Sequence, residues 1–379
     1  MVLLVAAYGG CGGNSKPNQI LALTYFPNGK VMSERRYLDE HYKVGIRQYY
    51  ETGELQSTWV LQENKLHGLF QGFYKSGKLH SEGQYKFGKP DGLIKGYYEN
   101  GALFKEENYK NGLRHGVSKE YNKDGSLKGE GQFIDGNGTF VSYYQNGAKN
   151  RVDNYVDGLL EGVLSYYAEN GQLLTEVTFN EGAAHGSCKL YWDNGKLLVS
   201  QNYMNGKLYG PFEEHYPDGT IKKTANYMHD LLEGTVKEYH PNGTLFRESF
   251  YMEGRLFDDL KEYYENGRLK THCRYENGEI NGVCRGFDDQ GVLLWEKNYD
   301  HGTLSGVSRD YYPSGELWFE SFIENGKLKR RVQYSREGQL VSDDDFPVEK
   351  YEINTDKILF NKEVFWEGGG SPLSENAVK

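Results

Sequence analysis

The sequence lacks the short motifs that mark most enzymes and the long apolar runs that mark membrane-spanning proteins. It contains no CxxC pair, HExxH, GxSxG or P-loop, so the usual signatures of zinc, hydrolase and nucleotide chemistry are missing. Beyond the first eleven residues, no stretch approaches the roughly 18 apolar residues of a transmembrane helix. The formal charge of -10 argues against nucleic acid or an anionic membrane surface as the main partner. We expect no enzyme activity, cofactor or metal.

Apolar residues are also scarce, at only 37% of the chain. The sequence instead holds 48 Gly and 32 Tyr in 379 residues. Tyrosine suits a surface that is packed yet wet, because its hydroxyl stays hydrated while its ring is buried. This composition favours a sheet one layer thick over a globule with a large core.

What the sequence does contain is a repeat, marked by the glycine of an x-N-G turn. Four residues before this turn glycine stands an aromatic residue in 13 of 14 copies, and two residues after it an aliphatic one in 13 of 14, with Lys149 the exception. The spacing is 24 except for one 22 and a final 23. Fixed periodicity at this length predicts one elongated domain of stacked units. The turn glycines are Gly29, Gly53, Gly77, Gly101, Gly125, Gly147, Gly171, Gly195, Gly219, Gly243, Gly267, Gly291, Gly315 and Gly338.

Each unit carries two turn signals, xNG and then NGxxxG, which predict strand, turn, strand, turn. For the first turn we favour a three-residue loop over 99–101, which pairs Tyr97 with Leu103, over a two-residue loop that would oppose Tyr97 to Phe104. For the second turn a four-residue loop would place Tyr109 opposite Gly116.

One copy is two residues shorter at its second turn. There Asp135-Gly136 is a strong two-residue hairpin signal that pairs Phe133 with Gly138. A loss of two residues preserves which side chains face which side of the sheet, whereas the final spacing of 23 does not.

The predicted fold is all-β: an elongated, single-layer, twisted antiparallel sheet of tandem 24-residue hairpin repeats. About fourteen repeats occupy 24–342. The first and last copies match the repeat pattern least well, as expected for the units that cap an array. Residues 12–23 are expected to be a linker, 343–367 a C-terminal cap and 368–379 a disordered tail.

Residues 1–11 resemble the end of a bacterial lipoprotein signal peptide. The segment is apolar and ends in Gly9-Gly10-Cys11, although Tyr8 stands where Leu is usual and no basic residue precedes the apolar run. We expect Cys11 to carry a lipid that anchors the protein in a bacterial cell envelope, facing the periplasm or the exterior. The alternative is a cytoplasmic protein with a disordered apolar N-terminus.

The other three cysteines bear on the register. The predicted pairing makes Cys273 and Cys284 direct cross-strand neighbours, close enough for a disulfide in an oxidising compartment. The alternative is a pair of reduced thiols in the cytosol. Cys188 occupies the position of Cys284 in an earlier unit, but its partner position holds Val177, so it should stay free.

Two further sets of residues recur with the repeat. His67, His115 and His185 share one repeat position, which favours a structural role over metal binding. Three residues before the turn glycine, an aromatic stripe offers rings for stacking on sugars, peptide side chains or lipid, and the alternative is ring packing between repeats. The stripe comprises Phe26, Tyr50, Tyr74, Tyr98, Tyr144, Trp192, Tyr216, Tyr264 and Tyr312.

The pattern GxxxxYYxNGxLxxxxxYxNGxxHG, which recurs over about 320 residues, resembles the MORN-repeat variant of bacterial proteins often named YwqK-like and labelled antitoxin components. The resemblance implies a twisted antiparallel sheet of hairpins but little about activity, since fold does not fix function. The leading hypothesis is a non-enzymatic scaffold that binds a protein partner. The alternatives are an antitoxin or immunity-type protein, and a binder of glycan or phospholipid.

Overall fold

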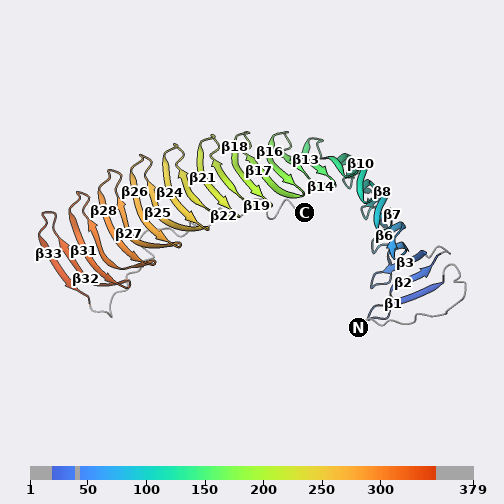
Figure 1. Ribbon diagram of the computed structural model, residues 1–379, viewed down its shortest axis with the longest axis horizontal. Helices are drawn as coiled ribbons and strands as arrows, with labels where there is room; N and C mark the ends of the chain where they lie inside the picture. The colour runs from blue at the N-terminus through green and yellow to red at the C-terminus, as the bar shows by residue number, and fades with distance from the viewer. Residues whose placement is uncertain (1–18, 39–42, 347–379) are drawn as a thin grey trace. The chain divides into compact units, whose positions relative to one another are not determined.

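The structure is a computed structural model that describes residues 19–38 and 43–346. These residues contain 33 strands in one long, open, antiparallel sheet (Figure 1). Neither a helix nor a second sheet covers a face of it in the described ranges, and none of these residues forms a helix suited to crossing a membrane. The predicted all-β hairpin sheet is confirmed.

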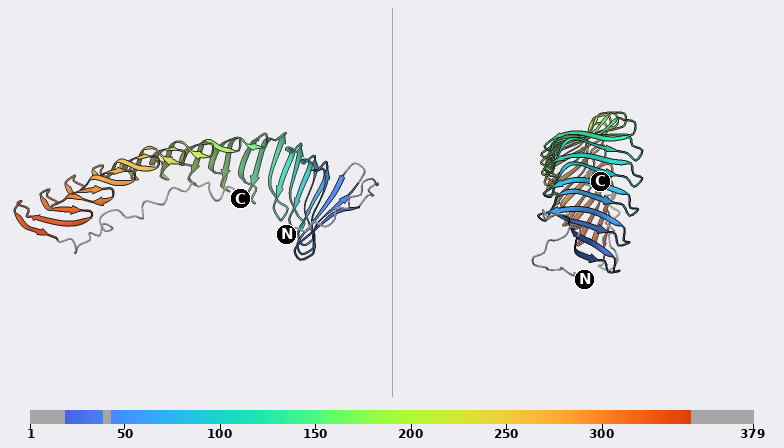
Figure 2. Two further views of the ribbon diagram at one scale, coloured as in Figure 1. Left: turned by 60° about the horizontal axis from the view of Figure 1, so that its bottom comes forward. Right: turned by 90° about the vertical axis from the view of Figure 1, so that its right-hand side faces the viewer.

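The described chain divides into two compact units, with the division falling inside β21 and the turn after it. Within each unit, strands that follow one another in the chain lie side by side (Figures 1 and 2). The first unit contains β1 (Ile20–Tyr25), β2 (Val31–Tyr37), β3 (Lys43–Tyr49), β4 (Leu55–Gln62), β5 (Lys65–Leu66), β6 (Gly68–Phe73), β7 (Leu79–Lys86), β8 (Lys89–Tyr97), β9 (Leu103–Lys110), β10 (Leu113–Tyr121), β11 (Leu127–Ile134), β12 (Asn137–Tyr143), β13 (Lys149–Val156), β14 (Leu159–Leu160), β15 (Gly162–Tyr167), β16 (Leu173–Asn180), β17 (Ala183–Tyr191), β18 (Leu197–Met204), β19 (Lys207–Leu208) and β20 (Gly210–His215). After β21 (Ile221–Met228), the second unit contains β22 (Leu231–Leu232), β23 (Gly234–Tyr239), β24 (Leu245–Met252), β25 (Arg255–Tyr263), β26 (Leu269–Glu276), β27 (Glu279–Phe287), β28 (Leu293–Asp300), β29 (Thr303–Leu304), β30 (Gly306–Tyr311), β31 (Leu317–Glu324), β32 (Lys327–Tyr334) and β33 (Leu340–Asp345).

The two ends of the sheet differ slightly from the expected boundaries. β1 begins at Ile20, so the sheet extends into the range 12–23 that is expected to be a linker. β33 continues through Asp345, so the acidic run at 343–345 belongs to the last strand rather than to a separate cap. The lipoprotein-like segment 1–11, most of the cap and the tail 368–379 lie outside the described residues.

The first turn of each repeat has the predicted three-residue loop. In the repeat at Gly101, the Tyr98 N–H donates to the Ala102 carbonyl at 2.8 Å, and the Gly101 N–H donates to the Tyr98 carbonyl at 2.8 Å. Gly101 has a φ of 89°, a conformation that glycine adopts without steric cost. Tyr97 lies opposite Leu103, as predicted.

The second turn differs from the prediction. Asn111 and Gly112 have φ values of 52° and 92° and form a two-residue loop, so Tyr109 lies opposite Arg114 and not Gly116. The predicted four-residue loop is wrong because an Asn-Gly pair readily takes the two left-handed conformations that the tightest hairpins need.

The two surplus residues form a bulge after the second turn. The bulge is centred on Gly116, whose φ is 99°. Beyond it Ser118 lies opposite Glu107, which is the register that the four-residue loop had also implied. The Asn108 side-chain amide donates to the Val117 carbonyl at 2.8 Å, so a side chain satisfies a carbonyl at the bulge.

The bulge also explains the irregular spacings. In the copy with spacing 22, Phe133 lies opposite Gly138 as predicted, and the strand pair shows no register shift. This copy has lost the bulge and kept the turn. The final spacing of 23 is taken up by a single-residue shift between Phe322 and Ile323.

Side chains alternate between two faces of the sheet. One face, here called the packed face, has a central row that contains Val177 and Cys188 in the first unit and Leu260, Cys273 and Cys284 in the second. Each of these five is at most 2% exposed. The side chains of this row are small or branched and lie beside larger aromatic rings. The rings therefore bury the row without a second layer.

On the other face, here called the charged face, acid and base alternate from strand to strand. Such opposite-charge cross-strand pairs each contribute a fraction of a kcal/mol and keep the face hydrated. The partners run Lys95, Glu106 and Lys119 in the first unit and Lys237, Glu248 and Lys261 in the second.

The cysteines lie in the expected register. Cys273 and Cys284 are direct cross-strand partners joined by a disulfide. Cys188 pairs with Val177, is fully buried, and has the Gln201 amide nitrogen 3.7 Å from its sulfur. Burial raises the pKa of the Cys188 thiol, which lowers its reactivity.

This arrangement predicts the thiol count of a Cys11→Ser variant produced in an oxidising compartment. Under denaturing conditions without reductant, titration should find one free thiol, from Cys188, and three after reduction. Adding Cys273→Ser should raise the unreduced count to two, since Cys284 loses its partner. Three free thiols in the unreduced Cys11→Ser variant would contradict the disulfide.

Candidate functional site

The aromatic stripe predicted from the sequence lies at the first turns. Its members are half-buried, and most use their polar atom to bind the main chain of the next repeat. The Tyr74 hydroxyl donates to the Tyr97 carbonyl at 2.7 Å, and Trp192 Nε1 donates to the His215 carbonyl at 3.2 Å. The same bond is made by Tyr50, Tyr98, Tyr144, Tyr264 and Tyr312 at 2.8 to 3.0 Å, while Tyr216 occupies the equivalent turn position.

Several rings of the stripe also lie beside a cation. Lys75 Nζ is 5.7 Å from the Tyr50 ring centroid, and Lys123 Nζ is 5.9 Å from that of Tyr98. Each lysine belongs to the turn of the following repeat. The hydroxyls and part of the ring surface of the stripe are therefore already engaged by neighbouring turns.

The asparagine of the xNG turn links repeats as well, which the sequence reasoning missed. Asn194 Oδ1 accepts the Lys196 N–H at 3.0 Å, and its Nδ2 donates to the Pro217 carbonyl at 2.7 Å. Asn precedes the turn glycine in seven of the 14 copies, and this recurrence was the available signal. It was attributed to turn geometry alone, although only a side chain with both donor and acceptor serves both bonds.

The recurrent histidines touch the second turn of the next repeat. His115 Nδ1 lies 3.0 Å from Asp135 Oδ1, and His185 Nδ1 lies 3.3 Å from Asn205 Oδ1. The His67 ring meets the Phe87 ring edge-on at 4.8 Å between centroids. No group of three or more His, Cys, Asp or Glu residues suited to a metal occurs in 19–38 and 43–346.

Buried carboxylates on the packed face are paired with cations. Glu107 is 4% exposed and lies 2.7 Å from Lys105 Nζ and 2.9 Å from Arg114 Nη2. Burial opposes its ionisation, but the two cations hold the pKa of Glu107 below its usual value. Asp153 is 1% exposed and lies 2.6 Å from Arg151 Nη2, yet burial dominates there and raises the pKa of Asp153.

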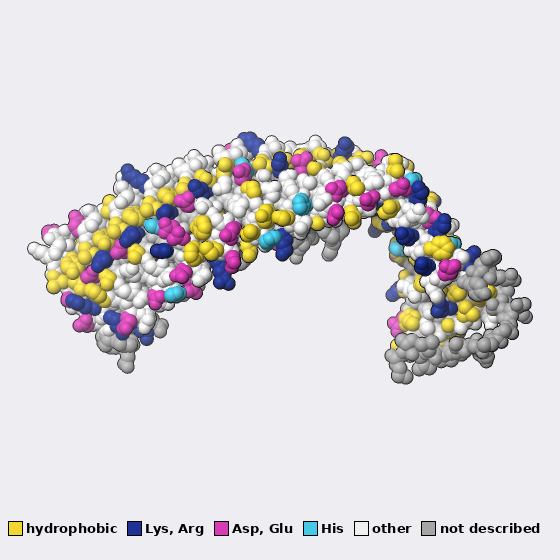
Figure 3. All heavy atoms as spheres, viewed as in Figure 1, with side chains coloured by type: hydrophobic (Ala, Val, Ile, Leu, Met, Phe, Trp, Pro, Cys, Tyr) yellow, Lys and Arg dark blue, Asp and Glu magenta, His cyan; other side chains and the backbone are white. Residues whose placement is uncertain are grey.

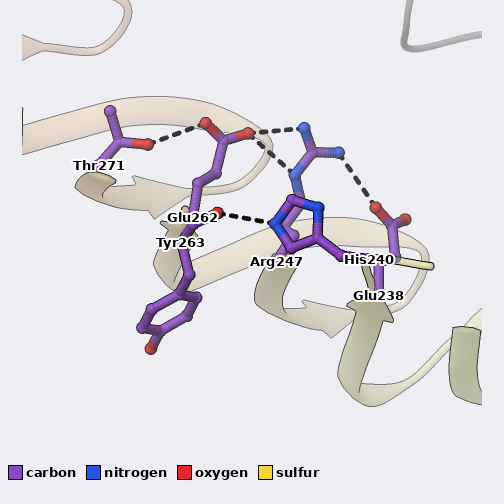
Figure 4. A network of polar contacts seen from close by, with 6 residues as sticks. All are labelled: Glu238, His240, Arg247, Glu262, Tyr263 and Thr271. Carbon is purple, nitrogen blue, oxygen red and sulfur yellow. Dashed lines mark hydrogen bonds and ion pairs between the residues drawn. The ribbon is translucent and has the colours of Figure 1, made fainter. Parts of the chain in front are cut away.

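A longer polar network crosses four strands of the second unit (Figure 4). Arg247 lies between two carboxylates, 2.6 Å from Glu262 Oε1 and 3.4 Å from Glu238 Oε2. The Thr271 hydroxyl donates to Glu262 Oε2 at 2.9 Å. Every charge in the network has a partner in the protein, so the network joins strands and offers no free acid or base.

Tyrosines on the charged face are bound to glutamates of the previous repeat. The Tyr97 hydroxyl donates to Glu82 Oε1 at 2.9 Å, and that of Tyr121 donates to Glu106 Oε1 at 2.7 Å. Burial and then the nearby glutamate raise the pKa of Tyr97 to about 12, as they do for Tyr121. These phenols stay protonated at neutral pH and are unsuited to act as bases.

The hollows on the described surface are shallow. One of about 430 Å³ is lined by Ala148, Lys149, Tyr167 and residues 169–171, where Lys149 replaces the usual aliphatic residue. Another of about 140 Å³ includes Glu248 and Asp258. Neither brings together a nucleophile and a base. Cys11, the predicted lipidation site, lies outside the described residues.

Comparison with known proteins identifies the repeat. A family model described as the MORN repeat variant matches residues 19–39, 66–87, 90–111, 114–135, 160–181, 184–205, 232–253 and 259–277. The unmatched stretches include the shortened repeat around 136–159, which still forms the hairpin described above. No curated protein matches the sequence.

Matches among solved structures include the crystal structures of TcdB2-TccC3-Cdc42 and TcdB2-TccC3. They are 12% and 11% identical to this chain, cover 84% of it in both cases, and have TM-scores of 0.17. The chain spans only 21% and 22% of those chains, and at these TM-scores the likeness supports no conclusion about fold or function.

The hydrogen bonds of the stripe predict paired effects on stability. Tyr98→Phe should lower the free energy of unfolding by about 1 kcal/mol, because the Tyr121 carbonyl loses its donor. Ala168→Tyr, which supplies a ring where the stripe is interrupted, should raise it by a similar amount. Urea denaturation followed by circular dichroism measures both.

Tyr25→Phe is the control, because the Tyr25 hydroxyl makes no hydrogen bond to any described residue. An Ala168→Tyr variant less stable than the parent, or a Tyr98→Phe variant equal to the control, would contradict the proposed bond.

Proposed function

This chain belongs to the family of proteins built from the MORN repeat variant, and we propose that it is a non-enzymatic scaffold that binds a protein partner through its sheet surface. The support is a row of exposed aliphatic side chains on the charged face of the first unit. They recur at one repeat position, eight residues before the turn glycine. Leu69, Leu93, Val117 and Val163 are 44%, 39%, 43% and 41% exposed.

These side chains have no apolar partner directly across the strand pair. Their cross-strand partners are polar: Leu69 lies opposite Gln84, and Leu93 lies opposite Asn108. Ile134, 65% exposed, adds to the apolar surface at the second turn of the shortened repeat. Figure 3 shows hydrophobic side chains distributed among charged ones on the surface. Exposed aliphatic groups repeated in register suit a protein interface, where apolar contacts are rimmed by charges.

The side chains of the aromatic stripe already contact neighbouring repeats. This favours the proposed function over the alternative, in which the stripe binds a glycan or phospholipid. The hydroxyls of the stripe bind the next repeat, and lysines lie near several rings. A ligand stacking there would compete with contacts inside the protein.

The experiment is cross-linking capture from the source cells with the full chain as bait. A partner captured by the wild type should be lost from a Leu69→Ser, Leu93→Ser, Val117→Ser variant, because binding of that partner buries these side chains. A Gln84→Asn, Gln132→Asn variant changes neighbouring exposed residues without removing apolar surface, so it should retain the partner. Equal capture by both variants would show that the aliphatic row is not the interface.

We also propose that Cys11 anchors the protein in the cell envelope. Expressed with an upstream signal sequence, the protein should incorporate labelled fatty acid, and Cys11→Ser should abolish the label. An unlabelled cytoplasmic product would refute the anchor and favour the antitoxin or immunity-type alternative, in which the bound partner is a toxin.

A further inference from the structure

One row of cross-strand neighbours on the packed face of the second unit contains charged residues at one end and aromatic residues at the other. The row begins with the ion-paired residues of Figure 4 and continues into rings. Trp295 on β28 and Phe319 on β31 are each the direct partner of Asp310 on β30. In sequence order its members are Glu238, Arg247, Glu262, Thr271, Gly286, Trp295, Asp310, Phe319 and Gln333.

The two rings are held in place by their neighbours. The Trp295 indole covers bare backbone at Gly286, where an added Cβ would lie 2.2 Å from Trp295 Cε2. Phe319 contacts Trp318 at 4.6 Å between centroids, and Trp318 stacks on Tyr312 at 5.3 Å. Figure 3 shows hydrophobic side chains gathered over β28 to β33 with Lys and Arg among them.

Each ring of the row carries a cation. Lys297 Nζ lies 5.1 Å from the Trp295 ring centroid, and the Arg331 guanidinium carbon lies 3.8 Å from that of Phe319. An aromatic ring beneath a Lys or Arg side chain restricts the position of the charged group, and the N–H donors of that group then point away from the ring.

These cations lack the close carboxylates that other packed-face cations have. Lys105, Arg151 and Arg247 each lie 2.6 or 2.7 Å from a carboxylate oxygen. Lys297 forms no ion pair with any described residue, and the nearest carboxylate oxygen of Arg331 is that of Asp310, at 4.0 Å.

Two buried polar atoms near the cations are also unpaired. Arg331 Nε has no hydrogen-bond partner in the structure, and neither does the hydroxyl of Ser308, which is 4% exposed. Burial lowers the pKa of Lys297, and Asp310 only partly opposes this. An uncompensated charge of this kind is costly unless an anion pairs with it.

We propose that Lys297 and Arg331, together with Trp295 and Phe319, bind a carboxylated glycan. The two rings stand two strands apart, about 10 Å, and hold the cations that lie over them at a spacing that suits carboxylates on alternate sugars of a chain. The cations pair with sugar carboxylates, and Asp310 accepts hydrogen bonds from sugar hydroxyls. The two hollows described above do not include these residues, and a site built on one face of the sheet suits an extended polymer over a small ligand.

The test is calorimetric titration of the full chain with oligogalacturonate, using its methyl ester as the uncharged probe. The wild type should bind the acid and bind the ester at least about tenfold more weakly. Lys297→Met with Arg331→Gln should weaken binding of the acid by about tenfold or more, and Trp295→Ala should weaken it similarly. The control, Lys237→Met with Arg309→Gln, removes the same charge from the charged face and should bind like the wild type.

Three results would overturn the proposal. One is no binding of oligogalacturonate by the wild type. Another is equal weakening in the control, which would indicate bulk charge alone. The third is binding to phosphatidylserine vesicles or an acidic peptide but not to oligogalacturonate, which would assign the cations to another partner. The double variant changes no apolar side chain, and its circular-dichroism melt verifies that a loss of binding is not a loss of fold.

Discussion

The sheet depends on hydrogen bonds that pass from each turn to the turn of the next repeat. A single-layer sheet has no second layer against which to bury itself, so its cohesion must run along the array. The second turns are joined through the main chain, as when the Gly112 N–H donates to the Pro90 carbonyl at 2.8 Å. The first turns are joined through Tyr, Trp and Asn side chains. Because these bonds are local, each repeat is stabilised by its neighbours and not by a shared core.

This constraint explains why so many recurrent polar residues have no chemistry of their own. Tyr98, Asn194 and His115 occupy positions that recur along the chain, and each contacts an adjacent turn. These recurrent positions are used for assembly of the sheet. Candidates for recognition are therefore positions where one repeat departs from its neighbours, such as Trp295 and Lys297, or where side chains recur without an internal partner, such as Leu93.

The period and the residue types at the first turn were enough to predict the fold and the pairing of Tyr97 with Leu103. The predicted alignment of Cys273 with Cys284 rests on the second turn, and it holds because the bulge restores the register beyond that turn. The second turn was mispredicted because the spacing gives the number of residues between recurring positions. It does not show which of these residues are left out of the cross-strand pairing. Asn111 and Gly112 close the hairpin earlier than expected, and Gly116 absorbs the difference. The row of rings and cations near Asp310 was missed for another reason. Cross-strand neighbours lie about a dozen residues apart, so the row appears in sequence only after the register is known.

The bulge after the second turn has a consequence for how such chains vary in length. It holds two surplus residues in the repeat at Gly116, one in the last repeat and none in the repeat at Gly138, while the central rows stay aligned on both sides. Insertions and deletions at this point change only the size of the bulge and leave the adjoining hairpins in register. The same change inside a strand would reverse the faces of the sheet. The bulge is thus the position at which repeat length varies within this chain while the cross-strand pairing on either side is preserved.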